Sequence, residues 1–201
     1  MKRLTAVTTV LGIASSLGIA VGLSTPAQAL PGQTVAEVAA WMRSNPTIRP
    51  GRNEQLIVRK SDSAAQRFSF ESSLFAPGAL VAGSRSGGRI RNETLKLFDM
   101  QNGVSKARLE EALRSIYGLD VTQDFDRAEP IYTYPTAATV ATGISQNKPI
   151  LSALHGEIRK GARFAYWVEV ARTAEGKAYS GRITVFQHRD IDKLEAEVRN
   201  R

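Results

Sequence analysis

The last fifty residues alternate between apolar and polar side chains, as strands with one buried face do. Strands are expected over residues 151–159, 163–172 and 177–187. Short turns at Lys160-Gly161 and Ala174–Gly176 join them, so the pattern predicts a three-strand antiparallel meander. Within the middle strand, Tyr166 and Trp167 fall on opposite faces of the expected sheet.

Elsewhere the apolar side chains recur every three or four residues, which is typical of helices. Helices are expected over residues 34–43, 105–117, 135–146 and 190–199. The first begins with the capping-box pair Thr34 and Glu37, and the second begins at Ser105. Asp190 is the expected cap of the last helix. That helix has an apolar stripe formed by Ile191, Leu194 and Val198.

Short apolar runs in the first two thirds of the chain predict further strands. They cover residues 56–59, 66–70, 79–82, 90–100 and 131–134. Runs of strands punctuated by helices indicate the α+β class, with an antiparallel sheet or sheets, a C-terminal three-strand meander and several packed amphipathic helices. Residues 30–201 are expected to form a single domain, and a division into subdomains 30–103 and 104–201 is left open.

Residues 1–29 have the three parts of a secretory signal peptide. Lys2 and Arg3 give a basic start, residues 4–23 are uncharged and mostly apolar, and Ala27-Gln28-Ala29 is a small-x-small exit. We therefore expect cleavage after Ala29 and a mature protein in the periplasm or outside the cell. An uncleaved anchor is the alternative, because the apolar run is nearly long enough to span a bilayer. No transmembrane segment is expected after cleavage.

Composition excludes several classes of protein and narrows the choice of partner. The 201 residues include no Cys, which excludes a disulfide framework, a thiolate metal site and a Cys nucleophile. The 27 Lys and Arg exceed the 19 Asp and Glu, for a net charge of +8. A basic exported protein attracts an anionic envelope polymer or an acidic protein. Nucleic acid is not expected as a partner, because the chain has no recognisable nucleic-acid module, and no cofactor motif stands out.

Five segments resemble those of an uncharacterised family of exported proteins from cyanobacteria. They are Leu30–Gln33, Trp41 with Asn45-Pro46, Ser115–Gly118, Arg163–Trp167 and Arg182–Phe186. The resemblance covers nearly all of the chain after residue 29, but it consists of structural segments rather than catalytic signatures. It implies an exported location and a family without an assigned activity, and it transfers no site residues to this chain.

Catalytic and metal-binding signatures are weak. His155 and His188 are expected a full strand apart and belong to no metal-binding spacing, so structural roles are favoured for both. Ser145 and Lys148 fit S-x-x-K, but the companion motifs are missing. Four acids also cluster along the chain, at Asp120, Asp124, Asp126 and Glu129. A solvated acidic loop is favoured there over a Ca²⁺ site, because the EF-hand spacing is absent.

The segment Gly83–Arg91 is the most suggestive local feature. Its glycines let backbone N–H groups approach an oxyanion, and Arg85, Arg89 and Arg91 can pair with a carboxylate, sulfate or phosphate. We expect this loop to be exposed and mobile, because the nearby sequence offers few acids to pair with its arginines. A solvated surface loop without a ligand is the simpler interpretation, and the sequence alone favours it.

Trp167 is a further candidate for ligand binding, because it faces away from Tyr166 and is expected on the less covered side of the sheet. The sequence as a whole favours an exported, non-enzymatic binding or scaffolding protein of the cell envelope with an anionic partner. An envelope hydrolase with dispersed acidic catalytic residues is the alternative. Neither the ligand nor the oligomeric state is indicated.

Overall fold

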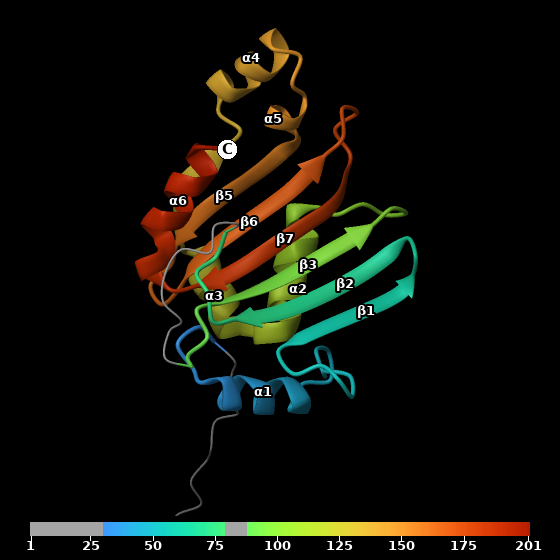
Figure 1. Cartoon of the computed structure of the whole chain (residues 1–201), viewed down its shortest axis with the longest axis vertical. Coiled ribbons are helices and arrows are strands. Elements are labelled where there is room, and N and C mark those ends of the chain that lie inside the picture. The colour runs from blue at the N-terminus through green and yellow to red at the C-terminus, as the bar shows by residue number, and fades with distance from the viewer. Residues whose placement is uncertain (1–29, 79–87) are drawn as a thin grey trace, which may run out of the picture.

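The structure is a computed structural model that describes residues 30–78 and 88–201. Figure 1 shows the elements in chain order: α1 (Val35–Ser44), β1 (Ile57–Ser63), β2 (Gln66–Ser73), β3 (Asn92–Asp99), α2 (Lys106–Tyr117), α3 (Leu119–Asp126), β4 (Glu129–Tyr134), α4 (Ala137–Ser145), α5 (Ile150–Ala153), β5 (Leu154–Lys160), β6 (Ala165–Arg172), β7 (Ala178–Phe186), the 3-10 helix η1 (His188–Asp190) and α6 (Ile191–Arg199). The strand expected at 79–82 and the loop up to residue 87 lie outside the described residues.

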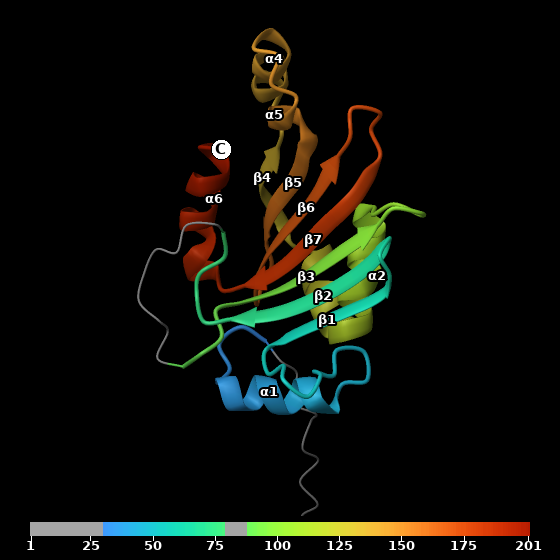
Figure 2. The same ribbon diagram turned by 45° about the vertical axis from the view of Figure 1, so that its right-hand side comes forward.

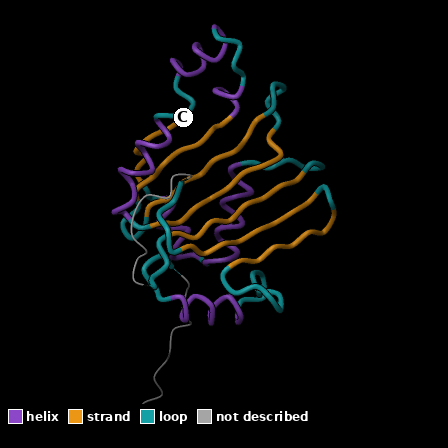
Figure 3. The backbone as a smooth tube through the Cα atoms, in the orientation of Figure 1, coloured by secondary structure: helices purple, strands orange, loops and turns teal. Residues whose placement is uncertain are grey.

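The seven strands form one antiparallel sheet with the order β1-β2-β3-β7-β6-β5-β4. Figure 3 shows these strands side by side, with helices around them. The N-terminal strands meet the C-terminal meander along β3 and β7, where Asn92 lies opposite Phe186. Segments 30–103 and 104–201 therefore contribute to the same sheet. The predicted α+β class with a C-terminal meander is confirmed.

Different helices cover the two faces of the sheet. Helices α2 and α3 lie on one side and α6 on the other, as Figures 1 and 2 show from two directions. On the first side Tyr166 joins the larger core cluster with residues of α1, α2 and α3, whereas on the second side Trp167 joins a smaller cluster with α6. We call the Tyr166 side the core face. The Trp167 side is the open face, because no described helix covers its β1, β2 and β3 portion.

Local sequence signals place the main helices correctly. Thr34 and Glu37 form the predicted capping box of α1, in which the Thr34 hydroxyl accepts from the Glu37 N–H at 3.3 Å. Ser105 accepts from the Arg108 N–H at 3.2 Å and so begins α2. Gly118 ends α2 with a φ of 77°, a conformation in which glycine avoids the strain of a side chain. No helix within residues 30–78 and 88–201 is long and apolar enough to cross a membrane.

The acidic cluster is not the solvated loop that the sequence favoured. Residues 119–126 form α3, and Asp124 is buried with 9% of its surface exposed. Its carboxylate accepts hydrogen bonds from four donors, which are the backbone N–H groups of Ala162, Arg163 and Phe164 and the hydroxyl of Tyr166. The donors lie around the turn from β5 to β6, which runs over residues 161–164 instead of the predicted two residues. Asp124 therefore stabilises that turn.

Asp190 also has a different role from the predicted one. Its side chain makes no capping hydrogen bond to α6. The carboxylate instead accepts two hydrogen bonds from the guanidinium of Arg91. The pairing of β3 with β7 explains this contact, because it brings the residues before Asn92 beside the residues after Phe186. The stripe of α6 packs on the open-face side of the sheet, away from Tyr166.

Candidate functional site

A row of charged side chains crosses the open face along consecutive strands. Cross-strand pairing aligns five residues in this row, namely Arg59 on β1, Ser69 on β2, Lys96 on β3, Arg182 on β7 and Glu169 on β6. Directly opposed residues of an antiparallel sheet share a face, so these side chains project to the same side. We call these five residues the basic row.

Cations of this region are left without compensating acids. Arg59, Arg67 and Lys96 are exposed, and none of the three forms an ion pair with another described residue. Arg67 lies on the open face two residues before Ser69 on β2, opposite Phe98. Its guanidinium stacks 4.2 Å from the centre of the Phe98 ring. The stacking holds the Arg67 side chain against the sheet and leaves its charge in solvent.

Three hollows follow the basic row and meet at Lys96. The first, of about 470 Å³, lies over β1, β2 and β3 between Arg59, Arg67 and Lys96. The second, of about 290 Å³, extends to Glu169, and the third, of about 200 Å³, extends past Arg182 to the segment after β2. Lys96 borders all three, so the hollows are neighbours on the open face, and we call them together the groove.

Hydroxyl and carboxylate groups line the groove between its cations. The hydroxyls of Thr94 and Thr184 are hydrogen-bonded to each other at 2.9 Å, and both residues border the third hollow. Ser69 and Ser180 border the first hollow. Glu71 is half-buried and also lines the third hollow. The groove therefore combines positive charge with both donors and acceptors of hydrogen bonds.

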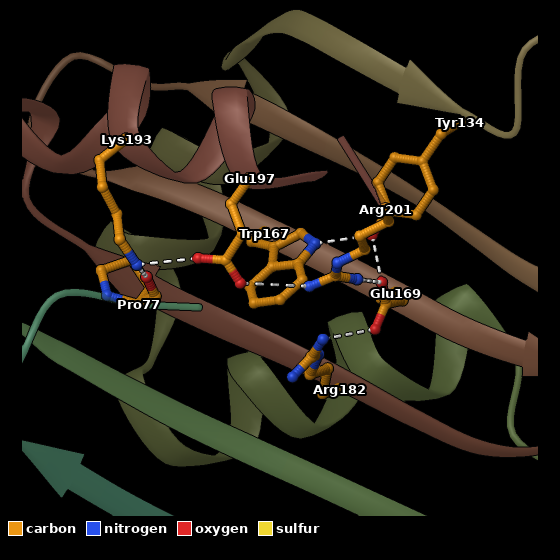
Figure 4. A network of polar contacts seen from close by, with 8 residues as sticks. All are labelled: Pro77, Tyr134, Trp167, Glu169, Arg182, Lys193, Glu197 and Arg201. Carbon is orange, nitrogen blue, oxygen red and sulfur yellow. Dashed lines mark hydrogen bonds and ion pairs between the residues drawn. The ribbon is translucent and has the colours of Figure 1, made fainter. Parts of the chain in front are cut away.

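A buried network fixes Arg182 in position (Figure 4). Its Nη2 donates to Glu169 Oε1 at 2.5 Å, and its guanidinium lies 3.7 Å from the centre of the Trp167 ring. Tyr134 and Arg201 both donate to the other carboxylate oxygen, Oε2, at 2.5 and 2.7 Å. Burial, followed by the charge of Glu169, raises the pKa of Tyr134 well above its usual range, so the phenol remains a donor. The Arg182 side chain is therefore already held in place beside the groove. It would lose little conformational entropy when a ligand binds to it.

Helix α6 holds the segment that borders the third hollow through a second set of contacts, shown in Figure 4. Lys193 donates to the carbonyl oxygen of Pro77 at 2.7 Å and to Glu197 at 2.9 Å. Glu197 lies 4.0 Å from Arg201, which joins this set to Glu169. The contacts attach α6 to the segment after β2, and Pro77 itself borders the hollow.

The carboxylates of the groove are poorly placed for glycosidase chemistry. Glu71 and Glu169 stand on β2 and β6, three strand separations apart in the sheet. That separation is about 14 Å at the backbone, whereas paired catalytic carboxyl groups lie about 5–9.5 Å apart. Glu169 is in addition occupied by three donors. Within the described residues, no group of three or more acidic or imidazole side chains could hold a metal ion.

The structure separates the residues that the sequence singled out. Trp167 is 1% exposed and lies beneath Arg182 and Arg201, so it supports Arg182 instead of offering a free stacking surface. Arg91 is largely buried and ion-paired with Asp190, so the expectation that it is exposed is wrong, because the matching acid lies far away in sequence. Arg89 is exposed and donates to the carbonyl oxygen of Gly32 at 2.9 Å. Arg85 lies outside the described residues.

The two histidines lie far apart. His155 is opposite Val170 on β6, whereas His188 follows the end of β7 beyond the Phe186–Ala165 pair. The predicted separation by a full strand is therefore confirmed. Burial, and next the charge of Arg172, lowers the pKa of His155.

Two other hollows, of about 520 and 500 Å³, lie near the turn between β6 and β7. The larger one is bordered by four cations. Lys106 and Arg108 pair with Glu157 and Asp99, whereas the exposed Arg172 and Lys177 form no ion pair with another described residue. The groove over the basic row has more uncompensated charge. Sequence reasoning missed that groove, although Arg59, Lys96 and Arg182 all fall on the polar positions of alternating strands.

Comparison of the chain with protein-family models, with curated proteins and with solved structures gave no match in any of the three. The functional argument therefore depends on the geometry of the groove.

Proposed function

We propose that this protein is an exported, non-enzymatic binding protein of the cell envelope that holds an anionic polymer in the groove of the open face. The observation that carries the proposal is the uncompensated charge of Arg59, Arg67 and Lys96 beside the fixed guanidinium of Arg182. Export is supported by the signal-peptide pattern of residues 1–29 and by the resemblance to exported cyanobacterial proteins.

A polymer fits this surface better than a small anion does. Each exposed ion pair contributes only about 0.2–1 kcal/mol, because water and salt screen it. One small anion on one cation would bind too weakly to matter. A chain with repeated charges engages several cations together, and the later contacts form at a high effective concentration. The separation of the cations over several strands therefore favours an extended, multiply charged ligand.

Replacing the three exposed cations tests the proposal. The variant Arg59→Gln/Arg67→Gln/Lys96→Gln removes three charges but keeps long polar side chains. Its affinity for an anionic polymer is expected to fall between about threefold and a hundredfold, because three contacts of about 0.2–1 kcal/mol each sum to about 0.6–3 kcal/mol. The slope of log K against log salt should flatten as well. Isothermal titration at several salt concentrations measures both.

A second triple variant provides the control. Arg52, Arg127 and Lys148 are exposed and lie outside the three hollows, so Arg52→Gln/Arg127→Gln/Lys148→Gln removes the same charge elsewhere. Its affinity is expected to stay within about twofold of the unchanged protein, which is within the usual effect of surface charges. Equal losses in both variants would mean that net charge, and not the groove, drives binding.

A further inference from the structure

We infer that the ligand of the groove is a carboxylated polysaccharide, a chain of sugar residues that carry hydroxyl groups and about one acid each. This inference rests on the proposed function and specifies its ligand. It follows from the spacing of the cations and from the acceptors between them.

The cations of the basic row are spread out. Arg59, Lys96 and Arg182 stand on strands one, three and four of the sheet order, and neutral Ser69 lies between the first two. Their backbones thus span three strand separations, or about 14 Å. Duplex DNA presents a charge every ~1.7 Å of its axis, so most of its charges along this row would face no cation. A sugar acid chain, with one charge per ring, matches the wider spacing.

Glu71 distinguishes a sugar chain from denser polyanions. An ionised carboxylate can only accept hydrogen bonds, so it requires donors on the ligand. Sugar hydroxyls provide such donors, whereas the oxygens of a polyphosphate provide none and are repelled. Glu71 lines the third hollow together with Thr94, Thr184 and the fixed Arg182. Within this hollow, Arg182 can pair with the ligand carboxylate while the neighbouring groups bind hydroxyls.

The apolar surface of the groove lies mainly in its first hollow, and its aromatic rings are partly covered. Among the described residues, the exposed large apolar side chains are Phe75, Met100, Leu119, Ile144 and Ile150. Only Phe75 of this set borders the groove, but the half-buried Phe68, Leu97 and Phe98 also line its first hollow. This apolar surface is open to a sugar ring as well as to an acyl chain, so the vesicle probe below decides between them. Phe98 is stacked against Arg67 and Trp167 is buried, which leaves neither ring open to a base.

The test is a titration of the exported chain with a panel of probes at one ionic strength. The probes are polygalacturonate, its fully methyl-esterified form, inorganic polyphosphate, duplex DNA and vesicles that contain phosphatidylglycerol. Polygalacturonate is expected to bind at least tenfold more tightly than any other probe, and esterification is expected to abolish binding. The groove triple variant Arg59→Gln/Arg67→Gln/Lys96→Gln should lose this preference.

Glu71→Gln tests the role assigned to the acceptor. It should weaken binding of polygalacturonate severalfold and strengthen binding of polyphosphate, whereas a variant that merely loosens the fold would weaken both. Glu129→Gln, which removes an exposed acid on β4 at the far edge of the sheet, should change neither affinity.

Two failures are distinguishable. If polyphosphate or DNA binds more tightly than polygalacturonate and the groove variant removes that binding, the inference is overturned and the proposed function stands. If the vesicles bind most tightly, both are overturned, because a membrane is not a polymer. If no probe binds, or if the groove variant binds every probe as well as the unchanged protein, both are overturned.

Discussion

At the scale of single residues, Glu93 is a carboxyl group buried on the core face. It is 1% exposed and accepts hydrogen bonds from the Tyr117 hydroxyl at 2.6 Å and from the Ser72 hydroxyl at 3.1 Å. Burial raises the pKa of Glu93 to about 7, although both hydrogen bonds act in the opposite direction. The folded protein therefore holds a proton on Glu93 at a pH where the unfolded chain has released it.

This raised pKa predicts how stability depends on pH. Because the folded pKa of about 7 exceeds the ordinary value of 4.5, the contribution of Glu93 is fully present below about pH 4.5 and is lost as the pH rises to about 7. Between pH 5 and pH 8 the free energy of unfolding should fall by about 2–3 kcal/mol more in the unchanged protein than in Glu93→Gln. Urea unfolding at the two pH values measures this difference. Parallel pH profiles for both proteins would contradict the prediction.

Asp124 shows what a sequence can and cannot reveal about one residue. The presence of an acid among other acids is visible in the chain, but its four hydrogen-bond donors come from residues 162–166, about forty positions away. Nothing local distinguishes Asp124 from Asp126, which is exposed on the same helix. Gly161 is required at this site, because a Cβ there would overlap the Asp124 carboxylate.

At the scale of elements, signals within a few residues predicted the fold well. The caps of α1 and α2 and the alternation of β6 are local patterns, and the structure confirms them. The pairing of β3 with β7 is the main feature that local patterns do not encode, because about ninety residues separate the strands. That pairing decides where Asp190 lies, so the capping role assigned to it from neighbouring residues was wrong.

The contact between the start of β3 and the start of α6 gives a prediction at this scale. Asp190 is 2% exposed and pairs with Arg91, so Arg91→Gln leaves a buried carboxylate without its cation. The free energy of unfolding should fall on the order of 3 kcal/mol. Arg89→Gln is the control from the same segment, and it should cost less than about 0.5 kcal/mol because Arg89 is exposed. Urea unfolding compares the two. Equal small effects would mean that the Arg91–Asp190 contact does not hold the elements together.

At the scale of the whole molecule, composition favours an anionic partner but does not locate a binding surface for it. The excess of basic residues favours an anionic partner, and the groove gives that preference a location on the open face. The basic row collects residues from β1, β3 and β7, which only the assembled sheet brings together. The continuous segment Gly83–Arg91 attracted attention because its arginines are neighbours in sequence, whereas a sheet surface is built from residues that are not.

Export is the remaining prediction about the whole molecule, since an envelope polymer is accessible only to an exported protein. When the full chain is expressed in a host with the general secretion route, cleavage should follow Ala29, because the peptidase accepts small side chains at Ala27 and Ala29. Amino-terminal sequencing of the exported fraction should then begin at Leu30. Cleavage there keeps Leu30 in the mature chain, where it is 7% exposed and belongs to the larger core cluster.

Ala29→Phe should block processing, whereas Gln28→Phe should not. Recovery of the intact chain from membranes with Ala29 unchanged would contradict cleavage and favour the uncleaved anchor.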